Sequence, residues 1–184
     1  MEQSRIFLVG FMASGKSRIG KLLANKLQYK YVDADDYIEA KAQQTIPQIF
    51  EERGEAYFRE LEQTCLHELV QEEQILVSTG GGMACHFDNM EQMNRSGLTI
   101  FLEVPPPIIT SRLLQAKNTR PLVKKFEHDR DALLNFIEGK LTERLPFYRQ
   151  AQITVDCKML IPTKIARLLH QDILSKKTDK GCEK

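Results

Sequence analysis

Cysteine and aromatic residues are sparse in this 184-residue chain, which contains no tryptophan and only four cysteines. Cys65, Cys85, Cys157 and Cys182 form no C-x-x-C pair and show no spacing typical of a metal site. The sequence therefore argues against a disulfide-stapled secreted domain and against a zinc module. Scattered thiols of this kind are typical of a cytoplasmic protein, in which they stay reduced.

An excess of charge of either sign is also missing, since 26 basic residues balance 25 acidic ones and the formal net charge is +1. This balance argues against bulk binding to nucleic acid or to an anionic membrane, so any positive field must be local. The chain has no apolar run long enough to span a bilayer, and residues 1–5 lack the features of a signal segment. We expect a cytoplasmic monomer with one domain over residues 1–175 and a polar tail over 176–184.

What the chain does have is a regular alternation of short apolar runs and longer segments with helical spacing. The runs that we expect to be strands cover residues 6–9, 29–33, 75–78, 98–104 and 153–155. Helical spacing is clearest over residues 19–27, 58–69, 108–114, 133–145 and 161–174. Strands that alternate with helices predict an α/β fold with a parallel sheet between helices, and its ligand crevice lies at the carboxyl ends of the strands.

The motif G-x-x-x-x-G-K-S at Gly10–Ser17 lies between the first predicted strand and the first predicted helix. This is the context in which the motif indicates a phosphate-binding loop and not an ordinary glycine-rich turn. Its backbone N–H groups and the positive end of the helix attract phosphate oxygens. We expect Lys16 to reach the β- and γ-phosphates of a nucleotide and the Ser17 hydroxyl to hold Mg²⁺.

Two acids, Asp33 and Asp35, follow the second predicted strand. Residues two apart in an extended chain face the same side, so we expect one carboxylate near Mg²⁺ and the other near an incoming hydroxyl. Arg59, Arg120 and Arg144 lie in three separate segments that should converge on the crevice. Each arginine alone is compatible with a surface ion pair, but together their planar guanidinium groups favour an anionic small substrate.

Two further stretches fit this crevice less specifically. Gly80-Gly81-Gly82 follows the third predicted strand, where its backbone either meets a ligand or forms a plain turn. Residues 115–125 contain four cations and one proline, which is typical of an exposed loop. Such a loop is either simply solvated or a lid that closes over phosphates and excludes water.

The chain resembles the shikimate kinase family from Ile6 to about Leu169. The motifs that carry the resemblance are Gly10–Ser17, Asp33-Ala34-Asp35, Gly54 through Phe58-Arg59, Gly80-Gly81-Gly82, Arg120-Pro121-Leu122 and Arg144–Tyr148. The resemblance implies transfer of phosphate from ATP to shikimate, giving ADP and 3-phosphoshikimate on the route to chorismate. It also implies a three-layer P-loop kinase fold with a five-stranded parallel sheet, a substrate-binding helical segment (about 33–61) and a lid (about 113–125).

The resemblance further implies a role for individual residues. The ATP site would comprise Ala13, Ser14, Gly15, Lys16, Ser17, Arg18, Arg112 and Arg120. The shikimate site would comprise Asp35, Arg59, Gly81, Gly82 and Arg144. Ser17 would coordinate Mg²⁺, and Asp33 would contact the waters of the metal ion. Lys16, Asp35 and Arg120 would be catalytic, with Asp35 either orienting or deprotonating the attacking hydroxyl.

Three positions depart from the family pattern. Arg18 stands where the family often has threonine, so its side chain either adds to the phosphate contacts or faces solvent. The arginine that stacks on adenine usually precedes the lid arginine by seven residues, but Leu113 occupies that position and Arg112 is one residue earlier. Residues 156–158, which should border adenine, carry no recognisable motif.

Two alternative functions remain. One is a related P-loop small-molecule kinase, such as a gluconate kinase, which the pair Arg59 and Arg144 and the motif Asp33-Ala34-Asp35 disfavour. The other is a nucleotide-binding relative without catalytic activity. Such a protein should have lost Lys16, Asp35 or Arg120, and this chain contains all three.

Overall fold

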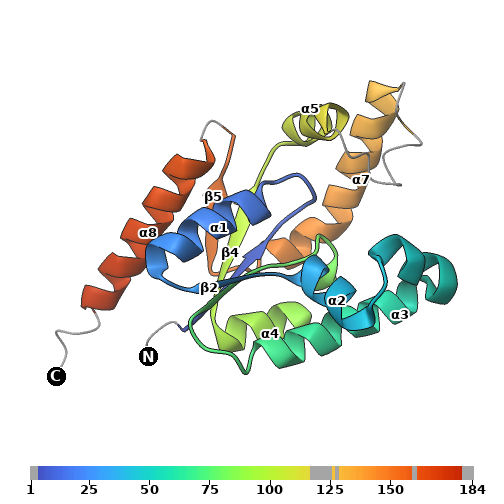
Figure 1. The fold of residues 1–184 in the computed structure, drawn as a ribbon. Coiled ribbons are helices and arrows are strands. Elements are labelled where there is room, and N and C mark those ends of the chain that lie inside the picture. Colours follow the sequence, from blue (N-terminus) through green and yellow to red (C-terminus); the bar gives the residue numbers. More distant parts are fainter. Residues whose placement is uncertain (1–3, 117–125, 127–128, 159–160, 180–184) are drawn as a thin grey trace.

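The computed structural model describes residues 4–116, 126, 129–158 and 161–179, and Figure 1 shows their arrangement. Five strands form one sheet in the order β2-β3-β1-β4-β5, and every neighbouring pair is parallel. The strands are β1 (Arg5–Val9), β2 (Lys30–Asp33), β3 (Ile75–Ser78), β4 (Leu98–Glu103) and β5 (Ile153–Asp156). The α/β fold with a five-stranded parallel sheet that the sequence predicted is confirmed.

Helices cover both faces of this sheet, as right-handed crossovers between parallel strands require. They are α1 (Lys16–Leu27), α2 (Ala34–Ala42), α3 (Ile46–Leu69), α4 (Asn89–Ser96), α5 (Pro106–Gln115), α7 (Arg130–Tyr148) and α8 (Pro162–Asp179), with a 3₁₀ turn, η1, over Met83–Cys85. Helix α1 packs against α8, and α5 packs against α7 (Figure 1). No helix in the described part of the chain is long and apolar enough to cross a membrane.

The central strands are buried on both faces, which explains their continuous apolar sequences. All residues of β3 and residues 6–9 of β1 are buried. The buried hydrophobic side chains form one cluster that includes residues of the sheet and of the helices on both sides. This cluster fixes the positions of the strand ends from which the loops of the candidate site emerge.

The start of α2 corrects one expectation. Asp33 ends β2 and is also the N-cap of α2, where its side chain accepts a hydrogen bond from the backbone N–H of Asp35. Asp35 therefore lies in the first turn of a helix and not in extended chain, so the predicted strand-like pairing of the two side chains is wrong. A carboxylate at an N-cap satisfies a helix N–H group that would otherwise lack a partner, and this favours a helix start directly after the strand.

Helix α3 has local sequence signals at its start and at its bend. Thr45 caps it in a capping box with Gln48, and Pro47 lies in its first turn. Gly54 interrupts the helical dihedral angles with φ 78° and ψ 177°, so the segment after the kink takes a new direction. At the other end of the chain, α8 continues to Asp179, beyond Leu174 where the apolar spacing predicted its end.

Candidate active site

The loop between β1 and α1 has the backbone geometry of a phosphate-binding loop. Gly10, Ala13 and Gly15 have positive φ angles of 141°, 58° and 102°, and Gly15 is the N-cap of α1. A side chain at Gly10 would place its Cβ 3.0 Å from the carbonyl oxygen of Leu102, so the close approach of β4 also requires glycine there. The loop therefore ends at the positive end of α1, which favours an anion.

Lys16 and Ser17 begin this helix and point toward the other predicted site residues. The buried Lys16 Nζ donates to the carbonyl oxygens of Gly10 and Phe11 at 2.7 and 2.9 Å, so the ammonium group lies along the loop. Ser17 Oγ donates to Asp33 Oδ2 at 2.8 Å. These two oxygen atoms, from residues 16 positions apart in the sequence, fit a Mg²⁺ ion that Ser17 would coordinate and whose waters Asp33 would contact.

A cavity of about 500 Å³ lies beside the phosphate-binding loop, and most of the predicted acceptor-site residues line it. Its lining residues are Phe11, Met12, Asp35, Ile46, Pro47, Phe50, Glu55, Phe58, Arg59, Glu62, Gly80, Gly81, Gly82, Phe136, Lys140 and Arg144. Aromatic side chains form part of its wall, and the ring centroids of Phe50 and Phe58 are 4.8 Å apart. The cavity thus combines apolar walls with a small number of charged groups, as ligand pockets generally do.

Arg59 is held in this cavity by two carboxylates of its own helix. Its Nη2 donates to Glu55 Oε1 at 2.6 Å, and its Nη1 donates to Glu62 Oε2 at 2.7 Å. Glu62 is fully buried and the Glu55 side chain is mostly exposed. The hydrogen bond from Arg59 lowers the pKa of Glu55, whereas burial outweighs the attraction of Arg59 and raises the pKa of Glu62 to about 7.

Arg144 reaches the cavity from α7 and is fixed by backbone and aromatic groups. Its Nη1 donates to the carbonyl oxygen of Gly81 at 3.1 Å, and its guanidinium carbon lies 5.4 Å from the ring centroid of Phe11. The buried Tyr148 hydroxyl donates to the same Gly81 oxygen. Burial raises the pKa of Tyr148 far above its usual value, so this hydroxyl keeps its proton at neutral pH.

The turn after β3 leaves room for these charged side chains because it consists of glycines. A Cβ at Gly80 would lie 2.7 Å from Asp35 Oδ1 and 2.8 Å from Glu62 Oε1. A Cβ at Gly82 would lie 2.5 Å from Arg59 Nη1. The glycines therefore allow the side chains of Asp35, Arg59 and Glu62 to lie close to the backbone of this turn. From the sequence alone we had expected only a contact between this backbone and a ligand, or a plain turn.

The structure describes two of the predicted nucleotide-site arginines, Arg18 and Arg112, and not Arg120. Arg112 Nη1 donates to the carbonyl oxygens of Ala13 and Ser14 at 2.9 and 3.1 Å, so it braces the loop from α5. Arg18 is exposed on α1. Arg120 lies outside the described residues, as does most of the predicted lid; its residues 113–116 are described and form the end of α5 and its C-cap.

Two residues of the site escaped the sequence analysis. Glu62 lies in a long helix where nothing in its own identity marks it, and Tyr148 was named only as the last residue of the motif Arg144–Tyr148, with no role of its own. The apolar spacing of α3 contains the missing signal, because Phe58, Glu62, Cys65 and Leu69 follow each other at helical intervals and are all buried. An acid on the apolar face of a helix, three residues after an arginine, indicates a buried ion pair.

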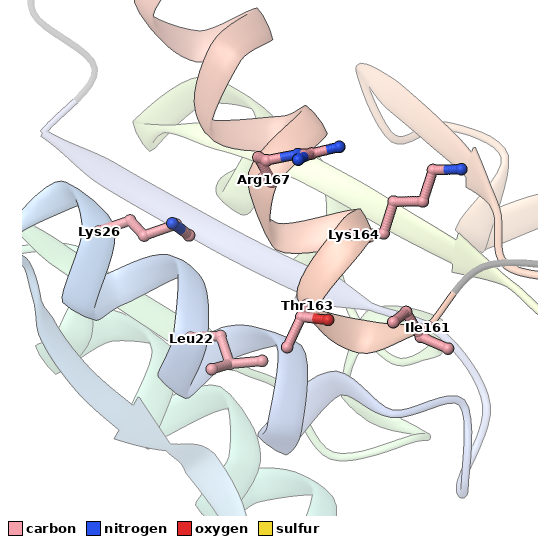
Figure 2. Close-up of a pocket in the computed structure, with 6 residues that line it drawn as sticks. All are labelled: Leu22, Lys26, Ile161, Thr163, Lys164 and Arg167. Carbon is pink, nitrogen blue, oxygen red and sulfur yellow. The ribbon is translucent and has the colours of Figure 1, made fainter.

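A second hollow lies away from this site, between α1 and α8 (Figure 2). Leu22 and Lys26 line it from α1, and Thr163, Lys164 and Arg167 line it from α8, together with Ile161 just before that helix. None of these residues belongs to the predicted site.

The fold and the site together define a P-loop kinase of the small-molecule type. The family model for shikimate kinase matches residues 12–174. The shikimate kinase of Bacteroides fragilis is 50% identical over 147 residues, which are 80% of this chain and 81% of that protein. The chain therefore belongs to the shikimate kinase family, and the resemblance inferred from its motifs is confirmed.

Solved structures agree with this family assignment. The crystal structure of shikimate kinase from Bacteroides thetaiotaomicron has a TM-score of 0.87 at 42% identity and covers 94% of this chain and 98% of its own. Shikimate kinase from Acinetobacter baumannii, solved in complex with shikimate, has a TM-score of 0.83 at 33% identity and covers 95% of this chain and 94% of its own.

Proposed function

We propose that this protein is an ATP-dependent shikimate kinase, which phosphorylates the 3-hydroxyl of shikimate and thereby serves the synthesis of chorismate and the aromatic amino acids. The observation that carries the proposal is the cavity beside the phosphate-binding loop, in which Asp35, Arg59 and Arg144 from three helices line one space. An acceptor with a carboxylate at one end and hydroxyls at the other suits a cavity that is lined by two guanidinium groups and by the carboxylate of Asp35.

Each of the predicted acceptor-site residues has a role in this proposal. Arg59 and Arg144 bind the carboxylate of shikimate, with the backbone N–H groups of Gly81 and Gly82 as further donors. Asp35 accepts hydrogen bonds from the hydroxyls and orients, or deprotonates, the one that attacks. The position of Asp35 supports this role, because its carboxylate lies in the cavity wall next to Gly80, with Oδ1 2.7 Å from the place where a Cβ on Gly80 would be.

The phosphate side of the reaction depends on the loop between β1 and α1. Its residues from Ala13 to Ser17 bind the phosphates of ATP, and Lys16 neutralises charge that develops on the transferred group. Ser17 would coordinate Mg²⁺ and Asp33 would contact the waters of this ion, which when bound offsets the charge of the β- and γ-phosphates. The hydrogen bond between Ser17 and Asp33 supports the fit, since both oxygens already share one small region.

Several finer expectations stay predictions. Arg120 is expected to contact the transferred phosphate from the lid, and Arg112 and Arg18 to contribute to the ATP site. The hydrogen bonds of Arg112 to the loop support its part of this expectation. A monomeric state, a cytoplasmic location, the domain limits 1–175 and the absence of nucleic-acid or membrane partners also stay predictions.

A coupled assay of ADP release tests the proposed reaction. We expect turnover with ATP, Mg²⁺ and shikimate, and no comparable turnover with gluconate or without an acceptor. Asp35→Asn is the matched control, since it keeps the size of the side chain; we expect kcat to fall by about 10²-fold or more with ATP binding retained. ADP release that does not depend on shikimate would contradict the proposal. Turnover with gluconate in place of shikimate would favour the alternative function, a gluconate kinase.

A further inference from the structure

One carboxylate of the acceptor cavity is only half satisfied. Glu62 is 1% exposed, and its Oε2 accepts the hydrogen bond from Arg59 Nη1 at 2.7 Å. Its other oxygen, Oε1, is buried and finds no hydrogen-bond partner among the described residues. A buried polar atom without a partner is costly, so a native structure that retains one needs an explanation.

The position of this oxygen provides the explanation. Glu62 Oε1 and Asp35 Oδ1 lie within 2.8 Å of the same point, the place where a Cβ on Gly80 would be. The two acids thus lie close to each other beside Gly80, and Glu62 is buried there, so both cannot be ionised without cost. A proton on Glu62 Oε1 would remove one negative charge and would turn the unsatisfied oxygen into a hydrogen-bond donor.

The other groups around Glu62 come from every element packed against it. Arg59 and Cys65 of α3, Asp35 of α2, Cys85 of η1 and Arg144 of α7 interact electrostatically with Glu62. Glu55 and His86 interact with Arg59 instead, and Tyr148 interacts with Cys85 and Arg144. Burial raises the pKa of Cys65 to about 12 and of Cys85 to about 11, and it lowers the pKa of His86. These thiols and the imidazole are therefore uncharged at neutral pH.

We propose that Glu62 is a proton-uptake site coupled to acceptor binding, which makes it a positioning residue for Arg59. The inference rests on the proposed function. When the carboxylate of shikimate enters beside Arg59 and Arg144, its negative charge adds to those of Asp35 and Glu62. Glu62 then takes one proton from solvent on Oε1, and Arg59 is free to bind the carboxylate of the acceptor. The proton returns to solvent when the bound molecule leaves.

This coupling predicts a pH dependence of affinity with a definite sign. A carboxyl that ionises near pH 7 in the free protein and at higher pH in the complex makes binding weaker as pH rises. The dissociation constant of shikimate should rise by up to about tenfold per pH unit above neutrality, since one proton is linked to binding. Shikimate itself does not contribute, because a carboxylic acid with a pKa near ~4 is ionised throughout this range.

Isothermal titration calorimetry measures the coupling directly. Shikimate is titrated into the full chain at pH 7 in two buffers of different ionisation enthalpy, so that the difference in heat gives the number of protons taken up. We expect about half a proton per shikimate for the native protein, because a group with a pKa near 7 is then half protonated before binding.

Three variants separate Glu62 from its neighbours. Glu62→Gln, an uncharged isostere of the protonated acid, should take up no proton and bind shikimate with an affinity that changes less than about twofold between pH 6.5 and 8. Glu60→Gln removes the same charge from an exposed position of α3 and should behave like the native protein. His86→Gln should retain the uptake.

The outcomes distinguish this inference from the proposed function. Tight binding of shikimate without proton uptake by the native protein would overturn the inference alone. Uptake that persists in Glu62→Gln, or that disappears in His86→Gln, would also overturn it, because the proton would then belong to another group. A native protein that does not bind shikimate at all would overturn the proposed function itself.

Discussion

The two arginines of the acceptor cavity are held by different kinds of partner. Arg59 lies between two carboxylates, whereas Arg144 is fixed by the carbonyl oxygen of Gly81 and by the ring of Phe11. The charge of Arg59 is thus partly balanced before any ligand enters, while no carboxylate lies within ion-pair distance of Arg144 among the described residues. At the scale of residues, Arg144 therefore supplies most of the uncompensated positive charge.

Substitution by lysine separates these two roles. Arg144→Lys keeps the charge but loses the planar fork, so we expect shikimate affinity to weaken by about 1.5–3 kcal/mol with stability almost unchanged. Arg59→Lys should weaken affinity by a similar amount and also lower stability, because it loosens the only ionic partner of the buried Glu62 within the described residues. Calorimetry with shikimate and with ATP, together with urea unfolding, measures both effects. An equal loss of affinity for ATP would place these arginines elsewhere.

At the scale of elements, the kink of α3 decides where Arg59 points. The helix begins at a capping box, bends at Gly54 and then carries Phe58, Arg59 and Glu62 into the cavity. The dihedral angles of Gly54 lie in a region that only glycine adopts without strain. A Cβ there would meet no atom within 4 Å, so the need for glycine is conformational and not steric.

Gly54→Ala should therefore destabilise the protein by about 1–3 kcal/mol and weaken shikimate binding, since relief of the strain would turn the second half of α3. Gly139→Ala is the matched control. Gly139 also has an open space around its missing Cβ, but it lies inside the regular helix α7, so alanine should stabilise the protein by up to about 1 kcal/mol. Urea unfolding of both variants measures the contrast, and two equal changes would refute the role of the kink.

The same elements show how far sequence reasoning reached. The strands, the helix start at Thr45 and the break at Gly54 were predictable, because apolar spacing, capping residues and glycine act locally. The orientation of Asp35 was not, since it depends on whether a helix starts directly after a strand. Glu62 was also missed, because its partners Asp35 and Gly80 lie on other elements and only the fold brings them to it.

The whole molecule places these elements at one edge of a sheet whose central strands are buried. The ends of β2 and β3 are in register, with Asp33 beside Ser78, so the acids and the glycine turn emerge together. Strand β1 lies between β3 and β4 and leads into the phosphate-binding loop. The rigid core thus holds the phosphate side and the acceptor side of the site next to each other, as the carboxyl edge of an open α/β sheet does in general.

Burial of Glu62 in this core also affects the stability of the whole fold. The folded state raises the pKa of Glu62 from 4.5 to about 7, so it binds a proton more tightly than the unfolded state does. The contribution of this group to stability is therefore full below about pH 4.5 and is lost as pH rises through 7. The free energy of unfolding of Glu62→Gln, measured relative to that of the native protein, should therefore rise by up to about 3 kcal/mol between pH 5 and pH 8.

Urea unfolding at the two pH values measures this gain, with Glu60→Gln as the exposed control. The free energy of unfolding of the control should stay within about ±0.5 kcal/mol of that of the native protein at both pH values. A Glu62→Gln variant whose stability runs parallel to that of the native protein would contradict a raised pKa at this position.

Analysis of the reaction product tests the central claim most directly. The protein is incubated with ATP, Mg²⁺ and shikimate, and the products are identified by ³¹P NMR and mass spectrometry, with Asp35→Asn in parallel. The account predicts one equivalent of shikimate phosphorylated at the 3-hydroxyl for each ADP formed, and product formation at least about 10²-fold slower with the variant. ADP accompanied by inorganic phosphate without phosphorylated shikimate, or phosphate on another hydroxyl, would contradict it.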